Sequence, residues 1–284
     1  MQKFNFLLVV SFFLVNQSFG QIDSLQVKTP QKITTWELAK NDAGLMWGGF
    51  KQVYTSPFQW DQDDWAIAAG IAIGTAGLNI IDQDAHDYFA DQEEKIPGVV
   101  KEFGWYFGSP QNNYGVNSAI YLTGLFTRNK KLRKTGILMI SSASAAGLIQ
   151  TISKTATGRA RPNAGSKATF RPFSKEGGYH SFPSGHTILS FTTFYALSKQ
   201  FDNIWVKSAL IAGGMVSPVS RLWAEAHWLT DIALSTALTV VVVDSIDKYL
   251  DKAMSSDPAY IEREKKISWQ LQFGGNRIGV IGTF

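Results

Sequence analysis

Apolar segments rich in glycine and alanine recur along this chain, and they constrain its fold more than any other feature. The clearest of them span residues 65–81, 116–126, 136–153, 187–199, 205–216 and 229–250. Their pattern is helical, and their small residues permit close packing between helices. Because no repeat or low-complexity linker interrupts them, the sequence predicts one all-α helical bundle over residues 46–255.

The same segments leave the relation to a membrane open. Most run for roughly 11–18 residues, whereas a helix needs about 20 apolar residues to cross a bilayer. We therefore expect buried helices of a soluble or peripheral bundle rather than membrane spans, with spans as the alternative. The basic residues at 128–134 predict a solvated turn between two helices, with contact to anionic lipid headgroups as the alternative.

Both ends of the chain differ from the bundle. Lys3, the apolar stretch after it and the small residues before position 21 are typical of a secretory signal peptide, residues 1–20, with an uncleaved anchor as the alternative. Residues 21–45 are polar and predict a poorly ordered lead. In the tail, residues 256–284, alternating side chains around a Gly-Gly-Asn turn predict a small C-terminal β-hairpin. The signal predicts an exported protein, periplasmic or associated with an envelope membrane, whose active site lies outside the cytoplasm.

The composition excludes several classes of function. The chain contains no cysteine, which rules out disulfides, thiolate metal sites and a cysteine nucleophile. Its formal net charge of +4 is not gathered into a long basic face, so we expect no nucleic-acid partner.

His227 and Asp231 lie four residues apart where the last helix begins. That spacing places both on one face of a helix, so the carboxylate can accept the proton of one imidazole nitrogen and leave the other free to attack. Taken alone, the pair fits an ordinary helix start equally well, with Asp231 near the positive end of the helix dipole.

Ser184, Gly185 and His186 follow a proline and precede an apolar helix. The free N–H groups of a helix N-terminus bind phosphate, and glycine lets the backbone approach it closely. His186 would then lie beside a leaving oxygen, where imidazolium serves as a general acid. The alternative is structural, with Ser184 as an N-cap and His186 as a first-turn residue.

Lys154, Arg161 and Arg221 supply three cations. Fixed cations stabilise the charge that spreads over the oxygens of a phosphoryl group in transfer. Considered alone, each of these three side chains is interpreted equally well as an ordinary residue on the protein surface.

Other polar residues are not assigned to the site. Asp82, Asp84, His86 and Asp87 do not have the spacing of a metal site, and we expect a solvated cluster at a helix end. Arg159 is expected either to join the cations or to be exposed.

Together the clusters resemble the type 2 phosphatidic acid phosphatase and vanadium haloperoxidase superfamily over residues 132–250. Six residues separate Lys154 from Arg161, five separate Arg221 from His227, and three separate His227 from Asp231, in the order of that family. The resemblance implies an all-α bundle of this type, in which His227 forms a phosphohistidine, Asp231 orients it, and His186 protonates the leaving alcohol and then activates water. It further implies that phosphate is held, without metal or cofactor, by Lys154, Arg161, Ser184, Gly185 and Arg221.

The function implied is a metal-independent phosphatase for phosphate monoesters or diphosphates. Apolar helices and abundant aromatic residues favour lipid phosphates as substrates and a membrane surface as partner. The alternatives are a broad-specificity soluble periplasmic acid phosphatase, a haloperoxidase with vanadate as its cofactor, and a non-catalytic protein that binds lipid or phosphate.

Overall fold

A computed structural model of the chain describes residues 33–256, 268–274 and 277–283. The predicted signal peptide, residues 1–20, lies outside the described residues, as does the part of the predicted lead up to residue 32.

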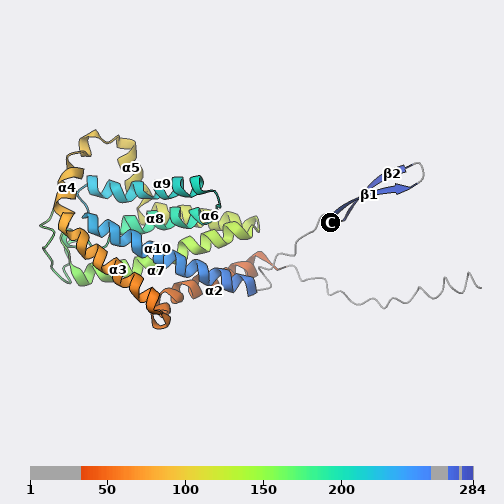
Figure 1. Cartoon of the computed structure of the whole chain (residues 1–284), viewed down its shortest axis with the longest axis horizontal. Coiled ribbons are helices and arrows are strands. Elements are labelled where there is room, and N and C mark those ends of the chain that lie inside the picture. Colours follow the sequence, from red (N-terminus) through yellow and green to blue (C-terminus); the bar gives the residue numbers. More distant parts are fainter. Residues whose placement is uncertain (1–32, 257–267, 275–276, 284) are drawn as a thin grey trace, which may run out of the picture. The chain divides into compact units, whose positions relative to one another are not determined.

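Helices make up most of the described chain (Figure 1). In chain order they are α2 (Thr35–Thr55), the 3₁₀ turn η1 (Ser56–Gln59), α3 (Gln62–Leu78), η2 (Asn79–Ile81), α4 (Asp82–Ala90), η3 (Glu93–Lys95), α5 (Gly98–Phe107), α6 (Pro110–Phe126), α7 (Lys130–Thr157), η4 (Gly177–Tyr179), α8 (Gly185–Ser198), α9 (Ile204–Trp223) and α10 (Leu229–Ser256). The prediction of an all-α bundle is confirmed.

The tail carries two strands, β1 (Ser268–Gly274) and β2 (Arg277–Thr283), which pair antiparallel with Ser268 opposite Thr283. The turn that would join them, residues 275–276, lies outside the described residues. The hairpin as a unit therefore stays a prediction.

Local side-chain signals set the helix boundaries. The Asp61 carboxylate accepts hydrogen bonds from the backbone N–H groups of Asp63 and Asp64 and so begins α3. Asn129 begins α7 in the same way. Gly158 ends α7 in the left-handed conformation, at φ 56°, which glycine adopts without strain.

The apolar core lies where α7, α8 and α10 pack together, with α2 and α6 against α7 (Figure 1). Its largest fully buried aliphatic side chains are Ile137, Leu138, Met139, Ile188, Val242, Val243, Ile246 and Leu250. This packing positions part of the predicted site, because Lys154 lies near the end of α7, His186 at the beginning of α8 and His227 just before α10.

The predicted lead is wrong from Thr35 onward, because α2 begins there. Asp42 of α2 is fully buried and forms a two-pronged ion pair with Arg133 of α7, at 2.9 Å from Nε and 2.6 Å from Nη2. A buried carboxylate interrupts the apolar periodicity, which is why the sequence pattern missed this helix. The prediction of a solvated basic turn is wrong at Arg133, because this side chain is buried and paired with Asp42.

The helices are also longer than their apolar runs. Three described segments are long and apolar enough to cross a membrane, namely Gln62–Ala90, Lys130–Thr157 and Leu229–Ser256. The predicted apolar runs at 65–81 and 136–153 are thus parts of longer segments, and these three segments meet the length and composition that the alternative of membrane spans requires. In α3 no residue is buried, although this apolar helix lies beside α10.

Candidate active site

A cavity of about 300 Å³ lies where helix ends from five elements meet. It is lined by Trp105, Gly108, Pro110, Gln150, Lys154, Arg161, Gly185, His186, Leu189, Arg221, Ala226 and His227. All three predicted cations and both predicted histidines are in this lining, although they come from separate segments of the chain. None of the lining residues is acidic.

The three cations make the cavity positive. Among the described residues, Lys154, Arg161 and Arg221 form no ion pair with an acidic side chain. Nε and Nη2 of Arg221 donate to the Ser220 hydroxyl, and its guanidinium lies 4.6 Å from the ring centroid of Trp105. A positive cavity of this kind favours an anion with several acceptor oxygens.

Burial lowers the pKa of both arginine side chains, and repulsion from Arg161 adds to the effect at Arg221. Burial, followed by the charge of Arg161, lowers the pKa of Arg221 to about 10. Burial also lowers the pKa of Arg161. An anion in the cavity would relieve both effects, because it lies close to each guanidinium.

His186 lies in the first turn of α8, with its ring 5.4 Å from that of Trp105. Its Nε2 is buried and has no hydrogen-bond partner among the described residues. Burial first, and then the charge of Arg221, lowers its pKa to about 3. The free cavity therefore holds His186 neutral at neutral pH.

His227 is almost fully buried, and its Nδ1 lies 3.4 Å from Oδ2 of Asp231. The same oxygen accepts from the backbone N–H of Trp228 at 2.9 Å and from the Ser181 hydroxyl. With Nδ1 facing the carboxylate, Nε2 is the ring nitrogen left for a ligand. Burial lowers the pKa of His227 to about 4 in spite of Asp231, so the imidazole is a neutral nucleophile.

Ser184 and Gly185 begin α8 at the cavity wall. Gly185 lines the cavity, but the Ser184 side chain does not; it accepts from the backbone N–H of Thr187 as the N-cap of the helix. The backbone N–H of Ser184 donates to the Ser235 hydroxyl at 2.7 Å. A phosphate contact of Ser184 stays a prediction.

Sequence reasoning missed two charged residues behind the site. Asp82 is fully buried, so a solvated cluster is the wrong interpretation of this residue. Arg159 neither joins the cavity lining nor lies exposed; it donates to Asp231 and to Asp82, each at 2.6 Å. The one sequence signal for Asp82 was its place directly after an apolar run.

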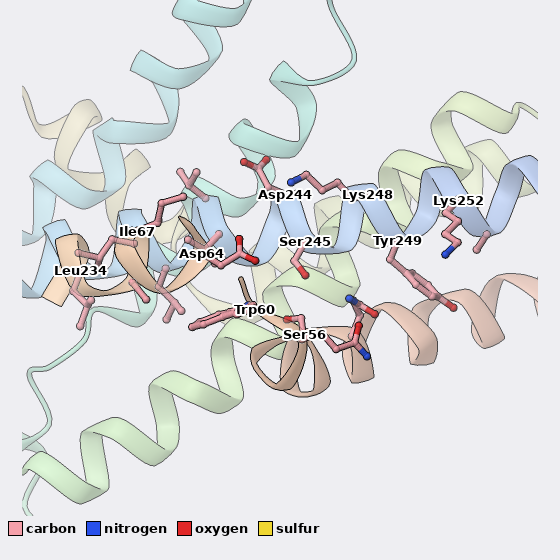
Figure 2. Close-up of a pocket in the computed structure, with 18 of the residues that line it drawn as sticks. Ser56, Trp60, Asp64, Ile67, Leu234, Asp244, Ser245, Lys248, Tyr249 and Lys252 are labelled. Atoms are coloured by element: carbon pink, nitrogen blue, oxygen red, sulfur yellow. The ribbon is translucent and has the colours of Figure 1, made fainter. Parts of the chain in front are cut away.

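A second cavity, of about 1060 Å³, lies between α10 and the segment from α2 to α3 (Figure 2). Apolar side chains such as Ile67 and Leu234 line one end, and Lys248 and Lys252 lie toward the other. It contains no histidine and none of the predicted site residues, so its size does not make it the reaction site.

Within the described chain, no group of three or more histidine, aspartate or glutamate side chains is arranged to hold a metal ion.

The chain was compared with known protein families, curated proteins and solved structures. Residues 135–250 match the family model of the PAP2 superfamily. No curated protein matches the chain. Among solved structures, LpxE of Aquifex aeolicus matches with 18% sequence identity and a TM-score of 0.42, over 57% of this chain and 94% of that protein.

Proposed function

We propose that this protein is a phosphatase that hydrolyses phosphate esters through His227, and the match of residues 135–250 to the family model of the PAP2 superfamily supports the proposal. The observation that carries the proposal is the cavity itself, where three cations surround two neutral histidines and no acidic residue is in the lining. The cations would bind the phosphoryl oxygens, and the histidines would carry the bond changes and proton transfers.

In the first step, Nε2 of His227 attacks phosphorus and the bond from phosphorus to the alcohol oxygen breaks. His186, charged by the bound substrate, donates its Nε2 proton to that oxygen, and the alcohol leaves. Asp231 stabilises the positive charge that develops on His227, because its carboxylate faces Nδ1. The product of this step is a phosphohistidine.

In the second step, water attacks the phosphohistidine. His186, now neutral, takes a proton from the water while the phosphorus–nitrogen bond breaks. Inorganic phosphate forms, and both histidines return to their starting states. The two steps together hydrolyse one ester bond.

We propose that the reaction needs no metal ion. A catalytic Mg²⁺ in a phosphoryl-transfer site is held by carboxylate oxygens and neutralises the phosphate charge. Here the lining offers Lys154, Arg161 and Arg221 in that role and contains no carboxylate.

We propose lipid phosphates as the substrate class. A volume of about 300 Å³ holds a phosphate group and its nearest atoms but not acyl chains, so the chains must lie outside the cavity. On α5, next to the cavity, the aromatic side chains of Phe103, Trp105 and Tyr106 are exposed and suit a membrane interface. The three membrane-capable segments support the same assignment.

The test is phosphate release in the presence of EDTA by wild type, His227→Ala and His180→Ala. His180 is the matched control, because it contacts the Ser174 carbonyl and lies outside the cavity lining. The substrates are a soluble aryl phosphate, phosphatidate and a polyprenyl diphosphate. We expect turnover in EDTA that His227→Ala abolishes and His180→Ala retains, with preference for a lipid substrate.

Equal turnover by His227→Ala would refute the histidine mechanism, and preference for the aryl phosphate would refute the lipid assignment. Rapid quenching with substrate labelled in the phosphate should leave label on wild type and none on His227→Ala. If no substrate is hydrolysed, bromide oxidation with vanadate and peroxide tests the haloperoxidase alternative.

A further inference from the structure

Arg159 connects the candidate nucleophile to a carboxylate from a distant part of the chain. Its guanidinium is buried and lies between Asp231 and Asp82, with Nη1 at 2.6 Å from Oδ1 of Asp231 and Nη2 at 2.6 Å from Oδ2 of Asp82. Both carboxylates are fully buried. One buried cation is thus shared by two buried anions.

Asp82 also holds the beginning of α10. Its Oδ1 accepts from the backbone N–H of Thr230 at 2.9 Å, and its Oδ2 accepts from the Thr230 hydroxyl at 2.6 Å. The same hydroxyl accepts from Nη1 of Arg159 at 2.6 Å. Since Thr230 directly precedes Asp231, Asp82 fixes the helical turn on which the partner of His227 lies.

The geometry leaves one oxygen of Asp231 for His227. Arg159 occupies Oδ1, which sets the plane of the carboxylate, and Oδ2 faces Nδ1 of His227 at 3.4 Å. Oδ2 also accepts from the Trp228 backbone N–H and from the Ser181 hydroxyl, so Arg159 adds the contact that holds the second oxygen. Without Arg159 the carboxylate would keep only its contacts at Oδ2, and its plane would be less constrained toward Nδ1.

The charges point to a second role for Asp82. A guanidinium paired with Asp231 alone would cancel the negative charge that His227 needs when it becomes positive. With Asp82 present, two carboxylates face one guanidinium, so the group keeps one net negative charge beside His227.

We propose that Asp82 is a positioning residue for His227, acting through Arg159 and Thr230 on the orientation and net charge of Asp231. The inference rests on the proposed function, in which His227 is the nucleophile. Asp82 lies outside the lining of the cavity, so it affects the reaction without contacting the substrate.

The kinetic test compares Asp82→Asn and Arg159→Lys with Asp84→Asn, a matched control because Asp84 is exposed in the same helix. Lysine keeps the charge of Arg159 but cannot bridge two carboxylates as the guanidinium does. For both variants of the network we expect kcat to fall on the order of tenfold, the lower end for outer partners of a site histidine, with KM within about twofold of wild type. Asp84→Asn should match wild type. An unchanged kcat in both network variants, or a loss confined to KM, would overturn the proposal.

A readout independent of turnover separates this inference from the proposed function. The chain has four histidines, so ¹⁵N-histidine labelling gives few ring signals, and His227→Gln assigns the one that matters. In wild type we expect neutral His227 with its proton on Nδ1. In Asp82→Asn we expect a mixture of the two tautomers. If wild type hydrolyses no ester, the proposed function fails while this spectrum still decides the inference, and an unchanged His227 signal in Asp82→Asn and Arg159→Lys would refute it.

Discussion

Anion binding in the cavity should charge His186, and the size of the effect follows from the structure. In the free protein, burial and then Arg221 hold the pKa of His186 at about 3. A general acid with that pKa carries no proton near neutral pH. For His186 to act as the proposed general acid, binding of the anionic substrate must therefore raise the pKa of His186 so that the imidazole takes up a proton.

The expected shift is about 3 pKa units. An anion whose oxygen accepts from Nε2 of His186 has its centre ~4 Å away. If the three cations balance one charge of a dianion such as sulfate, the remaining unit charge at that distance contributes about 4 kcal/mol at an effective dielectric constant of ~20. At 1.36 kcal/mol per pKa unit, the pKa of His186 rises from about 3 to roughly 6. At pH 5 the bound state then carries about 0.9 of a proton on His186, and the free state carries almost none.

Sulfate is the suitable probe, because its own charge is constant over this range of pH. Calorimetric titration in buffers of different ionisation enthalpy measures the number of protons taken up for each anion bound. We expect uptake at pH 5 and none at pH 8, with affinity falling as pH rises from 4 to 7. His227, whose pKa is about 4, also takes up protons, so the contribution of His186 is the difference between wild type and His186→Gln.

Two results would refute this reasoning. Equal proton uptake by wild type and His186→Gln at pH 5 would show that His186 is not charged by the anion. Sulfate affinity independent of pH from 4 to 7 would show that no group in the cavity gains a proton. Either result would remove His186 as the acid of the first step.

Two further predictions concern stability, each read as a thermal unfolding midpoint in detergent. Asp42→Asn removes the carboxylate that pairs with Arg133 inside the bundle and should lower the free energy of unfolding by about 3–5 kcal/mol; a midpoint equal to wild type would contradict this. In Gly158→Ala, the new Cβ would lie 1.7 Å from the Arg171 carbonyl oxygen, and residue 158 would keep its left-handed φ of 56°. We expect this variant to lose at least about 1–2 kcal/mol of the free energy of unfolding. Gly177→Ala is the control, because its Cβ would meet no atom within 4 Å, and it should lose less than half as much.

The cavity was predictable from sequence because its chemistry lies in short local patterns. A cation near the end of one helix, a histidine at the start of the next and a histidine four residues before a carboxylate can each be recognised without knowing the fold. Family spacing then indicated that Lys154, His186 and His227 act together, and the structure places all three in one cavity.

The residues behind the cavity could not be found in this way. Asp82 and Asp231 are far apart in sequence, and only packing brings both to Arg159. In a sequence, a charged residue after an apolar run predicts a solvent-exposed helix end. Asp82 is instead buried and contacts Thr230 of α10. The same limit hid α2, where Asp42 interrupts the apolar pattern and is matched by a partner in another helix.

The lining of the cavity also bears on turnover. Under the proposed function, the side chains around it would recognise the phosphoryl group, and at about 300 Å³ it would enclose little of the alcohol. Inorganic phosphate, the second product of the proposed reaction, keeps every oxygen that the three cations would contact, so it would compete with the substrate for the same cavity. Inorganic phosphate is therefore expected to be a competitive inhibitor, so that turnover slows as this product accumulates.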